Sequence, residues 1–387
     1  MRHFRIFIFA SIMATLIIPG KQAVAQLNLE TQEPYRGSSI CTPGVDPLDG
    51  CELNGPAKVQ LDWQKKGLSY PLMGLPAYTP DPSYNELPYR YAAILADPKR
   101  EVRLFPSLDD AVAADNQSGS IPAGALRWVA YTSQADVNGG HYVQLPDSFE
   151  WVRASPAEVV FFQGLAFYRT PDLEFGWLGD HTTSRIAPSL ESPSTGTRYL
   201  RNSVVQIFGT ERGNAEDWVQ IGINEWVESR FVKRVRINTT PPEGVTNNRW
   251  IEVNLYDQTL AVYENRQLVY ATMIASGLDP FFTKPGLFQI QKKLDTEKMT
   301  GAFESDRSDY YQLEKVPWTM YFDGARALHG AYWRTMFGFP QSHGCVNLSP
   351  GDAHYLFDWA NVGDWVYVWD PSGLTPTDPA KYGEGGA

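Results

Sequence analysis

Two short segments near the C-terminus constrain this chain more than any other feature of its sequence. The first is Leu-His-Gly-Ala-Tyr-Trp, beginning at Leu328, and the second is Ser-His-Gly-Cys-Val-Asn, beginning at Ser342. Cys345 is the only cysteine outside a short N-terminal pair. A thiol becomes a strong nucleophile when a base or a positive field raises its thiolate fraction, and imidazole can do this near neutral pH. The pattern therefore predicts a Cys–His reaction site.

The two segments together resemble the signature of the L,D-transpeptidases, the YkuD family, which cross-link peptidoglycan through a cysteine thioester. The resemblance extends over residues 249–369 and includes Thr-Lys-Pro-Gly from Thr283, where the family usually has Thr-Pro-Thr-Gly. Two departures are visible: Lys284 replaces the usual proline, and Asn347 stands where many members have arginine. Asparagine is a common alternative at that position.

The resemblance implies roles for the residues of the motif. Cys345 is expected to be the nucleophile and His329 the base, with the Gly330 carbonyl holding the histidine tautomer. We expect His343 to bind substrate or to support the thiol pKa. The N–H groups of Gly344 and Cys345 are candidates for an oxyanion hole, because acyl transfer builds negative charge on the carbonyl oxygen. The residues expected to contact substrate or to orient this loop are Ser342, Asn347, Trp333, Tyr310, Tyr311 and Tyr321.

Each of these assignments has a structural alternative. Cys345 could be an ordinary buried cysteine, His343 a structural hydrogen-bonding histidine, and many of the aromatic residues plain core. The aromatic side chains around 302–317 could instead form a pocket wall or lid. A metal site built from His329, His343, Cys345 and His354 is the chemical rival. This set lacks the Cys-x2-4-Cys and His-x3-5-His spacings of structural zinc sites, so we expect neither a metal nor another cofactor.

The N-terminus carries the pattern of a secretory signal over residues 1–25. Arg2 and Arg5 precede a short apolar run, and Ala-Val-Ala before Gln26 fits a cleavage site. The run is too short to span a bilayer comfortably, so we expect no stable membrane span after cleavage. Cleavage would remove three basic and no acidic residues, which moves the net charge from −11 to −14. Nucleic acid is therefore not an expected partner.

Cys41 and Cys51 bracket a loop rich in proline, glycine and aspartate. Outside the cytoplasm such a pair favours a disulfide, which leaves Cys345 as the odd, reactive thiol. The segment 26–87 that contains the pair has weak periodicity. It is interpreted as an N-terminal linker or extension, with a surface-packed segment as the alternative.

An internal repeat follows this segment. His-Tyr-Val-Gln-Leu at His141 and Glu-Trp-Val at Glu150 recur as Asp-Trp-Val-Gln-Ile at Asp217 and Glu-Trp-Val at Glu225. Short alternating strands repeated at this spacing suggest small barrels. They resemble bacterial SH3-like domains, which we expect at 88–160 and 161–240, with either a wall-peptide-binding or a spacer role.

The fold class expected is mainly β, with a sandwich-like L,D-transpeptidase catalytic domain at 249–370 after the two small barrels. Alternating residues predict strands at 250–256, 259–263 and 267–274. One helix is predicted at 350–360, because Pro350 stands at its start and apolar residues share one face. The residues after it, 371–387, are expected to form a flexible tail.

The resemblance implies an L,D-transpeptidase, a cysteine-dependent acyltransferase of cell wall biogenesis. Its partners would be peptidoglycan stem peptides, as acyl donor and as amine acceptor, in an extracytoplasmic location. The alternatives are an L,D-carboxypeptidase or cysteine peptidase that releases the acyl group to water, and a non-catalytic wall-binding protein. The intact Cys345–His329 pair argues against a non-catalytic protein, while transfer and hydrolysis both stay open at this point.

Overall fold

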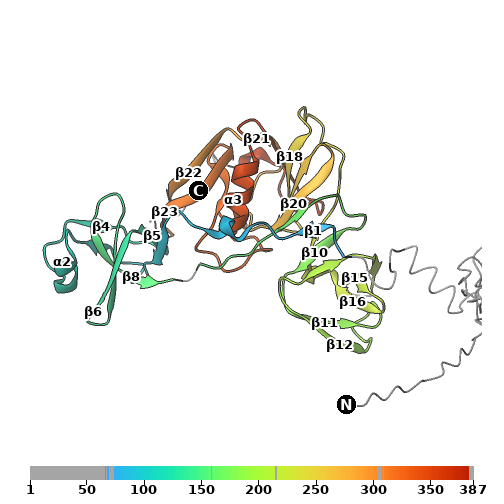
Figure 1. Ribbon diagram of the computed structural model, residues 1–387, viewed down its shortest axis with the longest axis horizontal. Coiled ribbons are helices and arrows are strands. Elements are labelled where there is room, and N and C mark those ends of the chain that lie inside the picture. The colour runs from blue at the N-terminus through green and yellow to red at the C-terminus, as the bar shows by residue number, and fades with distance from the viewer. Residues whose placement is uncertain are drawn as a thin grey trace, which may run out of the picture. The chain divides into compact units, whose positions relative to one another are not determined.

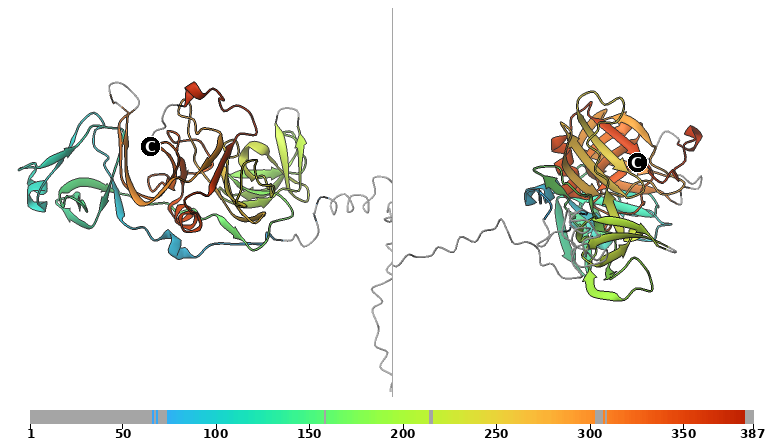
Figure 2. Two further views of the ribbon diagram at one scale, coloured as in Figure 1. Left: turned by 90° about the horizontal axis from the view of Figure 1, so that it is seen from above. Right: turned by 90° about the vertical axis from the view of Figure 1, so that its right-hand side faces the viewer.

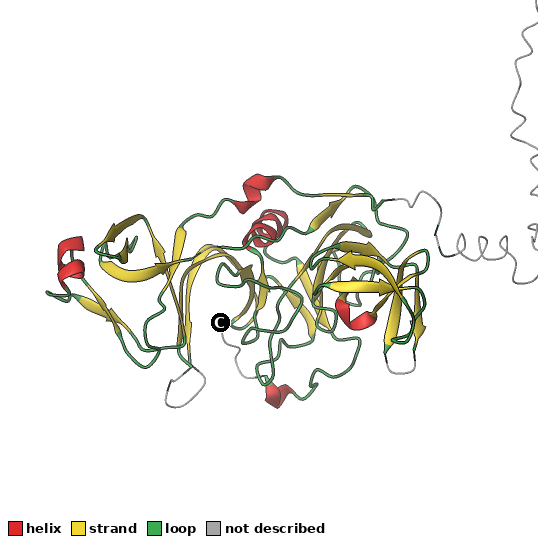
Figure 3. Cartoon of the chain, turned by 90° about the horizontal axis from the view of Figure 1, so that it is seen from below, coloured by secondary structure: helices red, strands yellow, loops and turns green. Residues whose placement is uncertain are grey.

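The computed structural model describes residues 66, 68, 74–157, 159–213, 216–302, 307 and 309–382 of the 387-residue chain. The signal segment, the Cys41–Cys51 pair and most of the 26–87 linker lie outside these residues, so their predictions stay predictions. Strands are the main element of the described part and helices are few (Figure 3). The mainly β fold class is therefore confirmed. No helix in the described part is long and apolar enough to cross a membrane.

A seven-stranded sheet carries the strands predicted from alternating residues. Its order is β1 (Ala77–Tyr78), β9 (Leu165–Phe167), β20 (Gln267–Met273), β19 (Thr259–Glu264), β18 (Arg249–Asn254), β26 (Trp365–Trp369) and β21 (Gly286–Gln289). The three central strands pair antiparallel as two successive hairpins, as the sequence predicts. Two edge strands, β1 and β9, come from segments far upstream in the chain, so the sheet extends beyond the catalytic segment.

A second, larger sheet holds the histidine and cysteine motif segments at one end. Its order is β25 (Val346–Leu348), β24 (Arg326–Gly330), β23 (Tyr311–Asp323), β5 (Leu126–Tyr131), β2 (Arg90–Ala93), β8 (Trp151–Pro156), β7 (Gly140–Gln144) and β6 (Ser133–Val137), with β22 (Lys292–Gly301) on β23. The orange strands β22 and β23 run side by side as a long hairpin (Figure 2). The parallel pairing of β5 with β23 makes the first repeat continuous with the catalytic sheet.

Each of the two sequence repeats contains an equivalent antiparallel hairpin. In the first repeat it is β7–β8, and in the second it is β15 (Asp217–Gly222) with β16 (Glu225–Glu228). The remaining strands of the second repeat lie in two small sheets (Figure 1): β10 (Phe175–Leu178), β11 (Thr182–Arg185), β12 (Ser194–Tyr199), β13 (Val204–Gln206), β14 (Gly209–Arg212) and β17 (Val232–Val235). The first repeat adds β3 (Val102–Leu104), β4 (Gly119–Ile121) and the short helix α2 (Leu108–Ala113).

Helix α3 (Pro350–Trp359) forms where the sequence predicts it and packs on the strands that hold the site. Ser349 caps its N-terminus by accepting from the Asp352 N–H, and Pro350 occupies the first turn. Ala353 and Leu356 are fully buried and join one apolar cluster with residues of β23, β24 and β25. The helix therefore packs against the strands that carry the motif segments (Figure 1).

Asp352, on the buried face of α3, ties a linker to the catalytic segment. Its carboxylate accepts the Gly164 N–H at 2.7 Å, the Tyr270 hydroxyl at 2.7 Å and the Thr272 hydroxyl at 2.6 Å. Because this carboxylate is fully buried and accepts from three donors, it holds the Gly164 backbone against helix α3 and strand β20.

The C-terminal segment departs from its prediction as a flexible tail through residue 382. Asp370 accepts hydrogen bonds from both the N–H and the hydroxyl of Thr375 and of Ser372, which closes a turn. A short 3-10 helix, η4 (Pro379–Lys381), follows, and Tyr382 is buried with Arg326 5.6 Å from its ring. Side-chain turn contacts, which carry no periodic signal, hold this segment in place.

Candidate active site

Parallel pairing of β24 with β25 brings the two motif segments together. His329 stands opposite Asn347 in the register, and Cys345 immediately precedes β25. The side chains of Cys345 and His329 are both buried, each residue being 2% exposed. The spacer between the segments thus forms the connection between two adjacent strands, a pairing that the sequence motif does not reveal.

The thiol of Cys345 lies against the strand edge of residues 325–327. The Ala327 N–H donates to Sγ at 3.4 Å, and Sγ lies 3.7 Å from the Ala325 carbonyl oxygen. Burial raises the pKa of the Cys345 thiol to about 11, against the opposing effects of the Ala327 N–H, Arg326 and Arg334. The resting residue is therefore a protonated thiol that needs a base to become nucleophilic.

His329 is held at both ring nitrogens. Nδ1 lies 3.4 Å from the Gly330 carbonyl oxygen, and Nε2 lies 3.0 Å from Asn347 Nδ2. Trp333 stacks beside the ring, with centroids 5.6 Å apart. Burial lowers the pKa of His329 to about 4, and the Arg334 charge adds to this while the Gly330 carbonyl opposes it. The imidazole is therefore neutral at physiological pH, as a general base must be.

His343 is placed between two aromatic rings. It contacts Phe281 at 4.8 Å and stacks on Tyr311 at 5.6 Å with an interplanar angle of 6°. Burial, and then the Arg334 charge, lower its pKa. Its ring thus packs on aromatic side chains, whereas His329 lies in β24 and bonds to Asn347.

The turn before Cys345 is shaped by Gly344 and Ser342. Gly344 has φ of +118°, a conformation that L side chains rarely adopt. The Ser342 hydroxyl donates to the Cys345 carbonyl at 2.5 Å and accepts the Gly344 N–H at 3.2 Å. The expected oxyanion donor at Gly344 is therefore engaged within the turn in this structure.

The predicted aromatic residues divide between the site and the surrounding structure. Tyr311 stacks on His343 and Trp333 stacks on His329. Burial, then Glu297 and the ionised form of Cys345, raise the pKa of Tyr321 to about 12. The buried Tyr310 instead has Arg307 4.8 Å from its ring. Trp318 stacks on His354 at 4.3 Å, away from the motif.

The metal site considered as the chemical rival is not formed by its four residues. His354 lies in α3 with Nδ1 3.2 Å from the Tyr84 carbonyl oxygen. Among the described residues no three His, Cys, Asp or Glu side chains are arranged to hold a metal ion.

Sequence analysis missed Arg334, which stands in the spacer between the two segments. Its Nε donates to Asn347 Oδ1, and its two NH2 groups donate to the side chain and the backbone carbonyl of Gln341. Burial lowers the pKa of Arg334 to about 10, and the ionised form of Cys345 opposes this shift. A lone arginine between aromatic residues was the only available signal.

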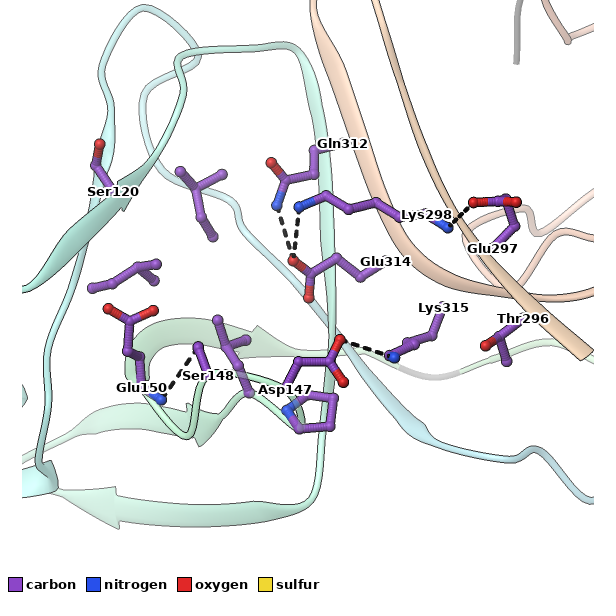
Figure 4. Close-up of a pocket in the computed structure, with 14 residues that line it drawn as sticks. Ser120, Asp147, Ser148, Glu150, Thr296, Glu297, Lys298, Gln312, Glu314 and Lys315 are labelled. Atoms are coloured by element: carbon purple, nitrogen blue, oxygen red, sulfur yellow. Dashed lines mark hydrogen bonds and ion pairs between the residues drawn. The ribbon is translucent and has the colours of Figure 1, made fainter. Parts of the chain in front are cut away.

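A cavity of about 480 Å³ lies elsewhere, between the first repeat and the β22–β23 hairpin (Figure 4). Its lining includes the ion pairs Lys298–Glu314 and Lys315–Asp147, but neither Cys345 nor His329. A second cavity of about 330 Å³ is lined in part by Thr283, which bonds to Gly344 of the motif turn, and by Pro340, which closely precedes Ser342. Neither Cys345 nor His329 lines either of these two cavities.

This fold and this site define a β-domain in which one of two parallel strands carries a buried histidine and the other begins directly after a buried cysteine. The family model of the L,D-transpeptidase catalytic domain, YkuD, matches residues 248–368. Residues 248–368 are therefore an L,D-transpeptidase catalytic domain. No match is found among curated protein sequences.

Solved structures similar to this chain include L,D-transpeptidases. The enzyme from Stackebrandtia nassauensis is 27% identical over 34% of this chain and 58% of its own, with a TM-score of 0.26. The catalytic domain from E. faecium is 26% identical over 33% of this chain and 100% of its own, with a TM-score of 0.29. The enzyme from Mycobacterium smegmatis is 12% identical over 69% of this chain and 99% of its own, with a TM-score of 0.30. At these TM-scores we take the class from the family match alone.

Proposed function

We propose that this protein transfers acyl groups between peptidoglycan stem peptides through a thioester on Cys345. The observation that carries the proposal is that the buried imidazole lies on β24 and the buried thiol lies directly before the paired strand β25, inside the matched domain. A neutral Cys–His pair suits acyl transfer, because the base can take the thiol proton as the sulfur attacks.

In the first half-reaction, Cys345 Sγ bonds to the carbonyl carbon that precedes the terminal D-amino acid of a stem tetrapeptide. His329 takes the thiol proton. The carbon–nitrogen bond then breaks, His329 returns the proton to the leaving amine, and a thioester remains. The Cys345 N–H is the candidate donor to the developing oxyanion, and the Gly344 N–H joins it if the bond to Ser342 opens.

In the second half-reaction, the amine of another stem peptide attacks the thioester carbon. His329 takes a proton from that amine, the carbon–sulfur bond breaks, and the proton returns to Cys345 Sγ. Water in place of the amine would give hydrolysis. Tyr311, Tyr321 and Trp333 line the surroundings of the pair and are proposed to contact substrate and limit water access.

The setting of this chemistry is also a proposal. We propose that the signal segment 1–25 directs the chain out of the cytoplasm, where stem peptides are its partners. The two repeats, at 88–160 and 161–240, are proposed as SH3-like modules. Strand pairing of β5 with β23 and of β9 with β20 favours their acting as parts of the enzyme's framework.

Intact-mass spectrometry of the enzyme with a stem tetrapeptide and no acceptor amine tests the acyl-enzyme. We expect the protein to gain the mass of the tripeptide acyl group while free D-alanine accumulates. Cys345→Ala should show neither change and should also resist acylation by a carbapenem. D-Alanine release by Cys345→Ala at the wild-type rate would refute the proposal.

A further inference from the structure

We propose that Arg334, acting through Asn347, selects the tautomer of His329 and is therefore a positioning residue for the base. The tautomer itself can be observed without substrate. Only its catalytic consequence rests on the proposed function.

The first step is the orientation of the Asn347 amide. The oxygen and nitrogen of an asparagine side chain are normally hard to tell apart, and only their partners decide the orientation. A guanidinium has donors and no acceptor. Because Arg334 Nε faces Asn347, the atom that it meets must be the amide oxygen, Oδ1.

Arg334 is itself held in place by Gln341. It therefore cannot move aside to let the Asn347 amide exchange its oxygen and nitrogen positions. Nη1 donates to Gln341 Oε1 at 3.3 Å, and Nη2 donates to the Gln341 carbonyl oxygen. Gln341 is anchored in turn, because its N–H donates to the Ser276 carbonyl at 2.8 Å. The Arg334–Gln341 contacts therefore connect the spacer to the segment that follows β20.

The second step is the tautomer. With Oδ1 turned to Arg334, Asn347 presents its NH2 group to His329, and that group can only donate. Nε2 of His329, 3.0 Å away, must therefore accept and carry no proton. The ring proton is left on Nδ1, which faces the Gly330 carbonyl oxygen at 3.4 Å. Arginine, amide, imidazole and carbonyl thus form one chain of hydrogen bonds in which each group donates to the next.

The third step is the consequence for the base. An Nε2 atom without a proton keeps the lone pair that a base needs, and the Asn347 N–H that occupies it here must withdraw before Nε2 takes a proton. Once Nε2 is protonated, it faces the NH2 group of Asn347 donor to donor, and Arg334 prevents the amide from turning to accept. The imidazolium is therefore disfavoured and returns its proton readily. The nearby Arg334 charge acts in the same direction and helps to lower the His329 pKa.

Nitrogen-15 NMR of histidine-labelled full-length protein tests the assignment, because protonated and bare ring nitrogens have distinct shifts. His329→Gln identifies the His329 signals by their loss. We expect wild-type His329 to show a bare Nε2 and a protonated Nδ1. Arg334→Met frees the amide, so a protonated Nε2 should appear in part or in full.

Three variants separate the tautomer effect from general damage. Arg334→Lys keeps a donor-only group facing Oδ1 and should restore the bare Nε2. Arg326→Met also removes a guanidinium close to Cys345, one that donates to Asp323 at 2.8 Å, and it should leave the tautomer unchanged. Asn347→Asp offers only acceptors and should put a proton on Nε2. This last variant keeps the test decisive if Arg334→Met does not fold.

A bare Nε2 in both Arg334→Met and Asn347→Asp would overturn the proposal. If the tautomer follows the prediction, Arg334→Met should also lower kcat by about tenfold or more, since a wrong tautomer is costly in coupled sites, with recovery in Arg334→Lys. A tautomer that changes as expected in a protein without transpeptidase activity would sink the proposed function and leave this inference intact.

Discussion

Thr283 Oγ1 donates to the carbonyl oxygen of Gly344 at 2.9 Å and accepts the Gly277 N–H at the same distance. Thr283 is 1% exposed, so water cannot replace either bond. One hydroxyl therefore ties the segment before β21 to the turn that presents Cys345. This contact gives a physical role to the threonine of the Thr-Lys-Pro-Gly segment.

Thr283→Val keeps the shape of the side chain and removes both bonds. We expect a loss of roughly 2–4 kcal/mol in the free energy of unfolding, since a buried N–H and a buried carbonyl lose their partner. Turnover should fall as well, because the turn before Cys345 loses its tether. Thr319→Val, also fully buried but bonded only within its own strand, is the matched control for urea unfolding. Equal effects of the two substitutions on turnover would contradict this role.

His329 and His343 should differ sharply on substitution. His329→Ala is expected to lose activity by about a thousandfold or more, as for a coupled catalytic group. His343→Ala should lose less and act through substrate affinity or loop stability, because its ring packs on Phe281 and Tyr311. Iodoacetamide alkylation of Cys345 against pH provides the independent measurement. If only His343→Ala changes the thiol pKa, the two roles are reversed.

Acid should destabilise the fold through His329. Its pKa is about 4 in the folded protein against an ordinary 6.5, so the unfolded chain takes up a proton first as pH falls. The stabilisation is complete above pH 6.5 and is lost as pH falls through the folded value, by roughly 3 kcal/mol in all. The stability difference between wild type and His329→Gln, from urea unfolding, should shrink between about pH 7.5 and about pH 4.5. A constant difference would rule out this titration.

The second repeat should influence catalysis through Lys233. This lysine of β17 lies over the Phe339 ring at 4.2 Å, and its stem contacts the Gly338 backbone position. Phe339 belongs to the spacer that leads to Ser342. Lys233→Ala should therefore lower kcat by about fivefold, equivalent to about 1 kcal/mol for a cation–π contact. Lys99→Met, at an exposed lysine of the first repeat, is the control and should not change kcat.

The sequence could predict what local pattern encodes. Strands β18, β19 and β20 and helix α3 follow from alternation, helical spacing and the proline at Pro350. The nearness of Cys345 and His329 follows from the family motif, because covalent catalysis needs both groups at one place. The parallel pairing of β24, which holds His329, with β25, which begins directly after Cys345, does not follow from either segment alone.

What the sequence could not predict depends on contacts between distant segments. Arg334 and Asn347 are thirteen positions apart, and neither shows its partner in a periodic pattern. The same holds for the anchoring of Gly164 by Asp352 and for the return of Tyr382 to Arg326. Such contacts are set by tertiary packing, which overrides local propensity at turns and chain ends.

Incubation of the purified protein with disaccharide-linked tetrapeptide muropeptides, followed by mass spectrometry, tests the central claim most directly. We expect cross-linked dimers, with one D-alanine released for each dimer formed, and no dimers from Cys345→Ala. Trimmed tripeptide monomers without dimers would instead identify an enzyme that transfers the acyl group to water. Unchanged muropeptides under conditions in which the folded protein retains its Cys345 thiol would contradict the account.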